Sequence, residues 1–132
     1  NGHTVKKIIC PEKKFTSSKQ EKPYKLNQIN SGNFDLVIEL HLNSSAPSAK
    51  GTEVLYTSSA GKKYAKKVQK QLSAVFLDRG IKRRDDLYIL NGTKPPAILL
   101  ETFFCTNKND YKKAKGILNR QKLAKRIAKG IG

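Results

Sequence analysis

Two side chains, the imidazole of His41 and the carboxylate of Glu101, are the ones whose type and position best suit them to do chemistry. Each follows a short, mostly apolar run, residues 36–40 for His41 and residues 96–100 for Glu101. A neutral imidazole is a common metal ligand, and a partly buried carboxylate can accept a proton and return it. The pair therefore suggests hydrolysis by a metal-activated water, although one histidine cannot hold a zinc ion alone.

The elements that carry these two residues are predicted to be strands. Both runs are too short for ordinary helices, contain β-branched residues and end at polar residues, which is typical of strands buried on both faces. Ligands of open α/β sheets bind beyond the carboxyl ends of the strands, and right-handed crossovers place those ends at one edge of the sheet. We therefore expect His41 and Glu101 to face one pocket.

Structural explanations compete with each chemical one. His41 also fits a half-buried, hydrogen-bonded histidine, and Glu101 fits a carboxylate paired with a lysine. Cys105 with His41 as its base would form a nucleophilic pair, but nothing in the sequence orients the thiol. Asp85 and Asp86 invite a metal, yet the basic residues directly before them favour a solvated turn. A Gly-rich phosphate loop, a Gly-x-Ser-x-Gly elbow and a Cys-x-x-Cys pair are all absent from the sequence.

The remaining pattern alternates strands with helices. Residues 12–24 are polar and predict an exposed loop. The predicted strands are Thr4–Cys10, the His41 run, Thr52–Tyr56, Asp85–Leu90 and the Glu101 run. Helices are predicted over residues 25–31, from Ser58 or Ser59 to Gly80, from Asn109 onward, and over about residues 119–129. Residues 1–132 are thus expected to form one α/β domain, with a mostly parallel, twisted sheet flanked by helices.

The composition is strongly basic. The 132 residues include 27 Lys and Arg against 10 Asp and Glu, a formal charge of +17, with a local excess after Asp110. Such a charge favours fast, salt-sensitive association with polyanions: nucleic acid, an anionic membrane or a teichoic-acid-bearing wall. No apolar run approaches the length of about 18 residues that a membrane span needs. Cys10 and Cys105 do not make a disulfide framework and are expected to be reduced and buried.

Four separated motifs resemble one enzyme family. They are Leu36–Ser44, Gly51–Tyr56, Leu87–Leu90 and Pro96–Asp110. Together they resemble the zinc-dependent N-acetylmuramoyl-L-alanine amidases of the type 3 amidase family, and most of all the catalytic domains of clostridial phage endolysins. The resemblance extends over almost the whole chain and is specific, because the motifs occur in the family's order.

The resemblance implies cleavage of the amide between N-acetylmuramic acid and the first L-alanine of the stem peptide. His41 stands at the position of one zinc ligand and Glu101 at that of the catalytic acid/base. The implied partners are peptidoglycan and anionic wall polymers, and no specific nucleic acid is expected. The protein is expected to be a monomer without a membrane span. The implied place of action is the bacterial cell wall, reached from the host cytoplasm at lysis if a phage encodes the protein, and otherwise by secretion.

One departure from the family concerns the metal. The family's first strand and first helix, which carry a His and a Glu ligand, have no counterpart here, so these two ligands are expected upstream of Asn1. His3 runs directly into the segment that matches the family's second strand and is not expected to be a ligand. Alone, the chain is expected to bind zinc poorly and to be inactive. Glu39, two residues before His41, is expected to pair with a lysine, or else to orient the imidazole.

Two rival functions remain open at this point. One is a basic nucleic-acid-binding domain, which would need aromatic residues interleaved with the basic ones or a recognition helix. The other is a wall-binding domain without catalytic activity.

Overall fold

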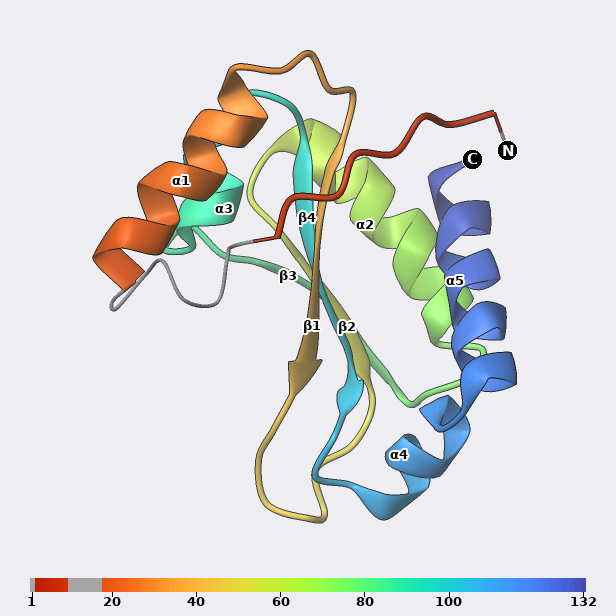
Figure 1. The fold of residues 1–132 in the computed structure, drawn as a ribbon. Helices are drawn as coiled ribbons and strands as arrows, with labels where there is room; N and C mark the ends of the chain where they lie inside the picture. The colour runs from red at the N-terminus through yellow and green to blue at the C-terminus, as the bar shows by residue number, and fades with distance from the viewer. Residues whose placement is uncertain (1, 10–17) are drawn as a thin grey trace.

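The computed structural model describes the backbone of residues 2–9 and 18–132. Its helices and strands alternate along the chain, as the sequence predicts (Figure 1). In chain order they are α1 Ser18–Asn30, β1 Val37–Asn43, β2 Thr52–Tyr56, α2 Ser59–Leu72, β3 Asp78–Arg83, α3 Tyr88–Asn91, β4 Ala97–Phe104, α4 Lys108–Ala114 and α5 Ile117–Ile131. In the described part of the chain, no helix is both long and apolar enough to cross a membrane.

The strands form one sheet in the order β1-β4-β2-β3. The β1–β4 and β2–β3 pairs are parallel, whereas β2 runs antiparallel to β4. The predicted α/β fold with a mostly parallel sheet is therefore confirmed, and the single antiparallel pair makes the sheet mixed. Because β1 and β4 are neighbours and parallel, their carboxyl ends lie together at one end of the sheet (Figure 1).

Helices cover both faces of this sheet. On one face lie α2 and α5, and on the other lie α1 and α3 (Figure 1). Alternate residues of β4 serve the two sides: Ile98 and Leu100 pack toward α2 and α5, whereas Ala97 and Leu99 pack toward α1 and α3. This explains why the Glu101 run is apolar throughout, since both faces of β4 are buried.

The long helix α2 begins where the sequence predicts and ends earlier. The Ser58 side chain accepts a hydrogen bond from the Gly61 amide at the N-terminus, and the helix ends at Leu72 instead of continuing to Gly80. Gly80 lies inside β3 with a φ of +80°, a conformation that favours glycine. Strand β3 was not predicted, because it is a mostly exposed edge strand of polar sequence without an apolar run.

Three other local predictions were wrong. Residues 4–9 form no strand: Val5 and Ile9 are 82% and 70% exposed, and the segment pairs with no described strand; Cys10 lies outside the described residues. The run 85–90 contains the start of helix α3, where Ile89 and Leu90 are buried by one helical turn. Residues 18–24 belong to α1, and the remainder of the predicted loop, residues 12–17, lies outside the described residues.

Asp110 joins the entry of β2 to the exit of β4. It is 2% exposed, and its Oδ2 accepts hydrogen bonds from the amides of Gly51 at 2.9 Å and Phe104 at 3.0 Å. Its own amide donates to Asn107 Oδ1, which caps α4. Asp110→Ala would leave two buried N–H groups unpaired, so we expect the free energy of unfolding to fall by about 2–4 kcal/mol.

Urea unfolding monitored by circular dichroism measures this loss. The matched control is Asn109→Ala at the exposed neighbouring position, where a change below about 0.5 kcal/mol is expected. Equal midpoints for the two variants would contradict the structural role of Asp110.

Candidate active site

His41 and Glu101 lie side by side at the carboxyl ends of adjacent strands. They are register partners in the parallel β1–β4 pair, and His41 Nδ1 lies 3.8 Å from Glu101 Oε1. Glu101 follows Leu99 by two residues, so its side chain lies on the sheet face covered by α1 and α3. The predicted juxtaposition of the imidazole and the carboxylate is confirmed, while their chemical roles remain predictions.

A third ionisable side chain, which the sequence analysis did not single out, flanks Glu101 on its other side. Glu53 of β2 is the register partner of Glu101 across the antiparallel β2–β4 pair, so His41, Glu101 and Glu53 form a row across three strands. Buried Glu53 forms ion pairs with Arg79, at 3.5 Å, and with Lys82. One feature of the sequence could have identified Glu53. It is a carboxylate inside the mostly apolar run 52–56, and a carboxylate in a buried strand needs a charged partner.

Glu101 itself is held in a partly dehydrated setting. Its side chain is only 16% exposed, and among the described residues its Oε2 is buried without a hydrogen-bond partner. Burial raises the pKa of Glu101, the negative charges of Glu53 and Glu39 raise it further, and the nearby His41 opposes the shift. The sequence also allowed Glu101 to be a structural carboxylate paired with a lysine, but no lysine contacts Glu101 among the described residues. A carboxyl group with a raised pKa and a free oxygen is suited to exchange protons.

Glu39 has both of the relationships that the sequence left open. Its Oε1 lies 3.4 Å from His41 Nε2 and 3.2 Å from the Nζ of Lys25, in α1. Burial works against the Lys25 ammonium, but hydrogen bonds to Glu21 and Glu39 outweigh it and raise the pKa of Lys25 well above its ordinary value. Lys25 therefore stays charged and fixes Glu39, which in turn contacts the imidazole.

The raised pKa of Glu101 predicts a pH-dependent stability. The folded state binds this proton more tightly than the unfolded chain does, so stability is full below the ordinary carboxyl pKa and falls as pH rises through the raised value. Glu101→Gln removes this titration. We therefore expect its free energy of unfolding, relative to the natural protein, to increase between about pH 4 and pH 7.

Urea unfolding of both proteins across this pH range, with a chelator present, gives the difference directly. A difference that stays constant with pH would contradict the assignment. Glu21→Gln is the control, because the pKa of exposed Glu21 is lowered by its hydrogen bond to Lys25, so the opposite trend is expected there.

The described residues alone do not form a metal site. Among them, no group of three or more His, Cys, Asp or Glu side chains is arranged to hold a metal ion. His41 is 44% exposed and accessible, with Glu39 and Glu101 as its acidic neighbours. The second histidine of the chain, His3, lies elsewhere: its Nε2 is 2.9 Å from the carbonyl oxygen of Gly132, beside the end of α5 (Figure 1). The donor set for zinc is thus incomplete in this part of the chain.

The remaining candidates from the sequence have other roles. Asp85 accepts hydrogen bonds from Thr57 and Arg83. Asp86 makes a bidentate pair with Arg84 that lowers its pKa to about 2, so the predicted solvated turn is confirmed. Cys105 is a free thiol, but it is exposed, and the expectation that it is buried was wrong.

Comparison with known proteins places the chain in a family. The family model described as N-acetylmuramoyl-L-alanine amidase (Amidase_3) matches residues 11–132. The chain belongs to this family. Its members are generally zinc-dependent. The fold is similar to that of the solved "Catalytic domain of CD27L endolysin targeting Clostridia Difficile", with a TM-score of 0.94 and 52% identity, covering 98% of this chain and 72% of that chain.

Two curated relatives come from Bacillus subtilis (strain 168). The chain is 35% identical to the uncharacterized protein YqiI over 74% of its own length and 50% of that protein. It is 32% identical to the N-acetylmuramoyl-L-alanine amidase LytC over 80% of its own length and 23% of that protein. The chain therefore spans half or less of the length of these relatives. The family expected from the four sequence motifs is confirmed.

Proposed function

We propose that this protein hydrolyses the amide bond between N-acetylmuramic acid and L-alanine in peptidoglycan, with Glu101 as the general acid/base. The observation that carries the proposal is the position of Glu101, beside His41 at the ends of two parallel strands, in a chain of the amidase family. The relative LytC bears the name of this activity, and the CD27L domain is the catalytic domain of an endolysin.

The Glu101 carboxylate would act on the proton of the attacking water. As the water oxygen bonds to the lactyl carbonyl carbon, Glu101 accepts the released proton, and it then donates that proton to the nitrogen of L-alanine as the C–N bond breaks. The Glu101 side chain is 16% exposed, so part of the carboxyl group remains accessible for this exchange. Burial raises the pKa of Glu101, which favours the protonated form that donates to the leaving amine.

We also propose that His41 is a zinc ligand. A zinc ion supplies Lewis acidity and lowers the pKa of a bound water. Because a catalytic zinc takes three protein ligands and the described residues form no such group, the other donors lie outside these residues. The described residues alone are therefore expected to hold zinc weakly.

Product analysis tests the proposed reaction. Purified peptidoglycan is digested with the protein at its natural length, and the new ends are identified by mass spectrometry and by labelling of free amines. An amidase creates one free L-alanine amine and one intact lactyl carboxylate for each bond cleaved, without new reducing sugar ends. New reducing ends, or new amines only on other residues, would show that the proposed bond is wrong.

The place of action follows from the substrate. A peptidoglycan amidase acts at the bacterial cell wall, and we propose that this protein acts there. We also propose that it is a monomer.

A further inference from the structure

One side of the molecule carries a concentration of positive charge that the candidate active site does not use. The helices α2, α4 and α5 hold about half of the chain's 27 basic residues and one acidic residue, Asp110. We call this surface the helical basic face. It consists of Lys62, Lys63, Lys66, Lys67 and Lys70 of α2, Lys108, Lys112 and Lys113 of α4, and Arg120, Lys122, Lys125, Arg126 and Lys129 of α5.

The charges of this face have no local compensation. The ion pairs found among the described residues involve none of its members and lie instead along β1, β2, β3 and their neighbours. The one acidic residue of the three helices, Asp110, is buried and uses its carboxylate to accept two backbone amides. Unpaired like charges within a Debye length of about 8 Å raise the local potential, which attracts a polyanion.

Close packing of α2 against α5 keeps the two rows of cations near each other. At Gly130 of α5, an added Cβ would lie 2.8 Å from the Cα of Val68 in α2. Along each helix, exposed lysines recur four residues apart, as Lys66 and Lys70 do in α2 and Lys125 and Lys129 in α5. This spacing sets neighbouring charges about 6 Å apart along the helix axis.

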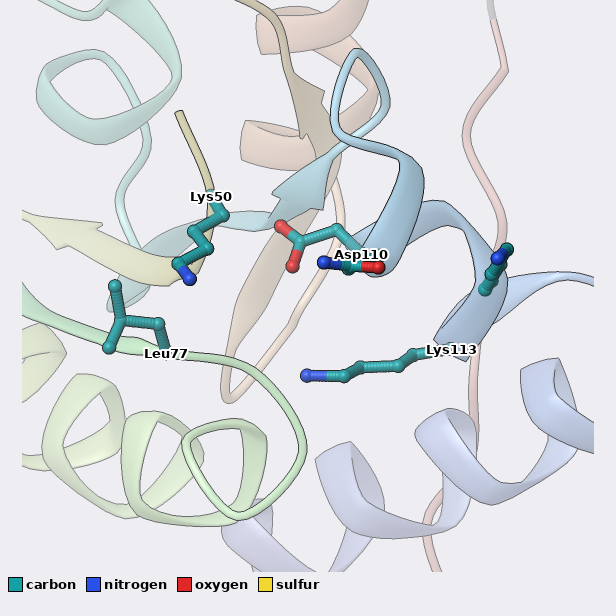
Figure 2. Close-up of a pocket in the computed structure, with 6 residues that line it drawn as sticks. Lys50, Leu77, Asp110 and Lys113 are labelled. Atoms are coloured by element: carbon teal, nitrogen blue, oxygen red, sulfur yellow. The ribbon is translucent and has the colours of Figure 1, made fainter. Parts of the chain in front are cut away.

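A recess at the α4 end of this face gives it a defined binding place (Figure 2). The recess has a volume of about 560 Å³ and is lined by Lys50, Leu77, Asn109, Asp110, Lys112 and Lys113. The side chains of Lys50 and Lys113 extend toward it from different segments, and the Lys113 ammonium is held by the carbonyl oxygen of Val75 at 3.0 Å (Figure 2). Three lysines thus line the recess together with the carboxylate of Asp110, whose Oδ2 accepts hydrogen bonds from two backbone N–H groups.

The helical basic face and the Glu101 row lie on opposite faces of the sheet. Glu39 and Glu101 share the side of α1 and α3, whereas α2 and α5 cover the other side (Figure 1). A polymer bound along α2 and α5 therefore leaves the carboxylate of Glu101 open to peptidoglycan.

We propose that the helical basic face binds a phosphodiester polymer of the bacterial wall, of the teichoic-acid class, with one phosphate in the recess of Lys50, Lys112 and Lys113. The choice of a wall polymer over other polyanions rests on the proposed function. A flexible chain with a phosphate on each short polyol unit can follow lysines about 6 Å apart on two helices. The three helices contain two aromatic residues, Tyr64 and Tyr111, so few side chains are available to stack on nucleic-acid bases.

Binding of purified poly(glycerol phosphate) teichoic acid tests the surface directly. The protein at its natural length is titrated by calorimetry at low salt, and circular dichroism confirms that each variant is folded. Lys66→Gln with Lys70→Gln, and separately Lys50→Gln with Lys112→Gln, are each expected to weaken binding about tenfold. The matched control removes two charges from the α1 and α3 side, Lys22→Gln with Lys94→Gln, and a change below about twofold is expected.

Two results would overturn the proposal. One is an equal loss in the control pair, which would mean that only net charge matters. The other is binding of duplex DNA, at equal phosphate concentration and salt, as tight as that of the teichoic acid. Cleavage of a soluble muramoyl peptide that carries no phosphate polymer is measured in parallel. Failure of this cleavage while polymer binding persists would count against the proposed amidase function and not against the surface.

Discussion

Replacing Glu101 by glutamine is expected to lower the rate of amide cleavage by about 100- to 10,000-fold, the usual contribution of a positioned acid/base group. Glutamine keeps the shape of the side chain but cannot take a proton from water or return one to the leaving amine. The substitution removes a buried charge whose Oε2 has no partner among the described residues, so the fold should persist. The measurement is the initial rate of release of L-alanine amines from purified peptidoglycan.

The control for this variant is Glu21→Gln. Glu21 lies on the same side of the sheet and contacts Lys25, but it is not in the row of His41, Glu101 and Glu53. A rate within about twofold of that of the natural protein is expected, because the Glu21 side chain is 40% exposed and Lys25 keeps its ion pair with Glu39 in this variant. If Glu101→Gln retained more than a tenth of the natural rate, another group would have to move the proton.

Replacing His41 by alanine is expected to remove zinc from the protein and to lower amide cleavage by roughly 100-fold or more, since a metal contributes several kcal/mol of transition-state stabilisation. The readout that does not depend on activity is the zinc content, measured by atomic emission after dialysis of the protein at its natural length. His41 is accessible, and its ring contacts two carboxylates that can fix its orientation, so loss of the ring removes a preorganised donor.

His3→Ala provides the matched control. The imidazole of His3 contacts the carbonyl oxygen of Gly132 at the end of α5, away from the carboxyl ends of β1 and β4 (Figure 1). Its replacement should leave the zinc content unchanged. Zinc retained in His41→Ala but lost in His3→Ala would reverse the assignment of ligands.

The sequence predicted the site well where burial leaves a pattern. The strand of Glu101 was found because both faces of β4 are buried and need apolar residues. The strand of His41 was found from its apolar run, but the expectation that both of its faces are buried was wrong, because Leu40 and Leu42 of β1 are exposed. Parallel neighbours then had to bring the two ends together, and the register of His41 with Glu101 follows from this. The buried apolar residues of α2, Ala65, Val68 and Leu72, could also be predicted because they recur at helical spacing.

What escaped prediction depends on tertiary pairing. Strand β3 is polar and lies at an edge, so its hydrogen bonds to β2 leave no apolar signal in the sequence. Glu53 gains its position beside Glu101 only through the antiparallel β2–β4 pair, whereas the sequence pattern predicted mainly parallel pairing. The apolar residues of segment 4–9 suggested a strand, but a strand needs a neighbour, and that segment pairs with no described strand.

The position of β4 inside the sheet has a consequence for how the protein loses activity. Its backbone is bonded to β1 on one side and β2 on the other, whereas β1 is bonded, among the described strands, to β4 alone. Glu101 is therefore anchored by two ladders and His41 by one. Local unfolding of β1 on warming would separate the imidazole of His41 from the carboxylate of Glu101 while the hydrophobic core remains folded. Loss of activity would then occur at a lower temperature than global unfolding.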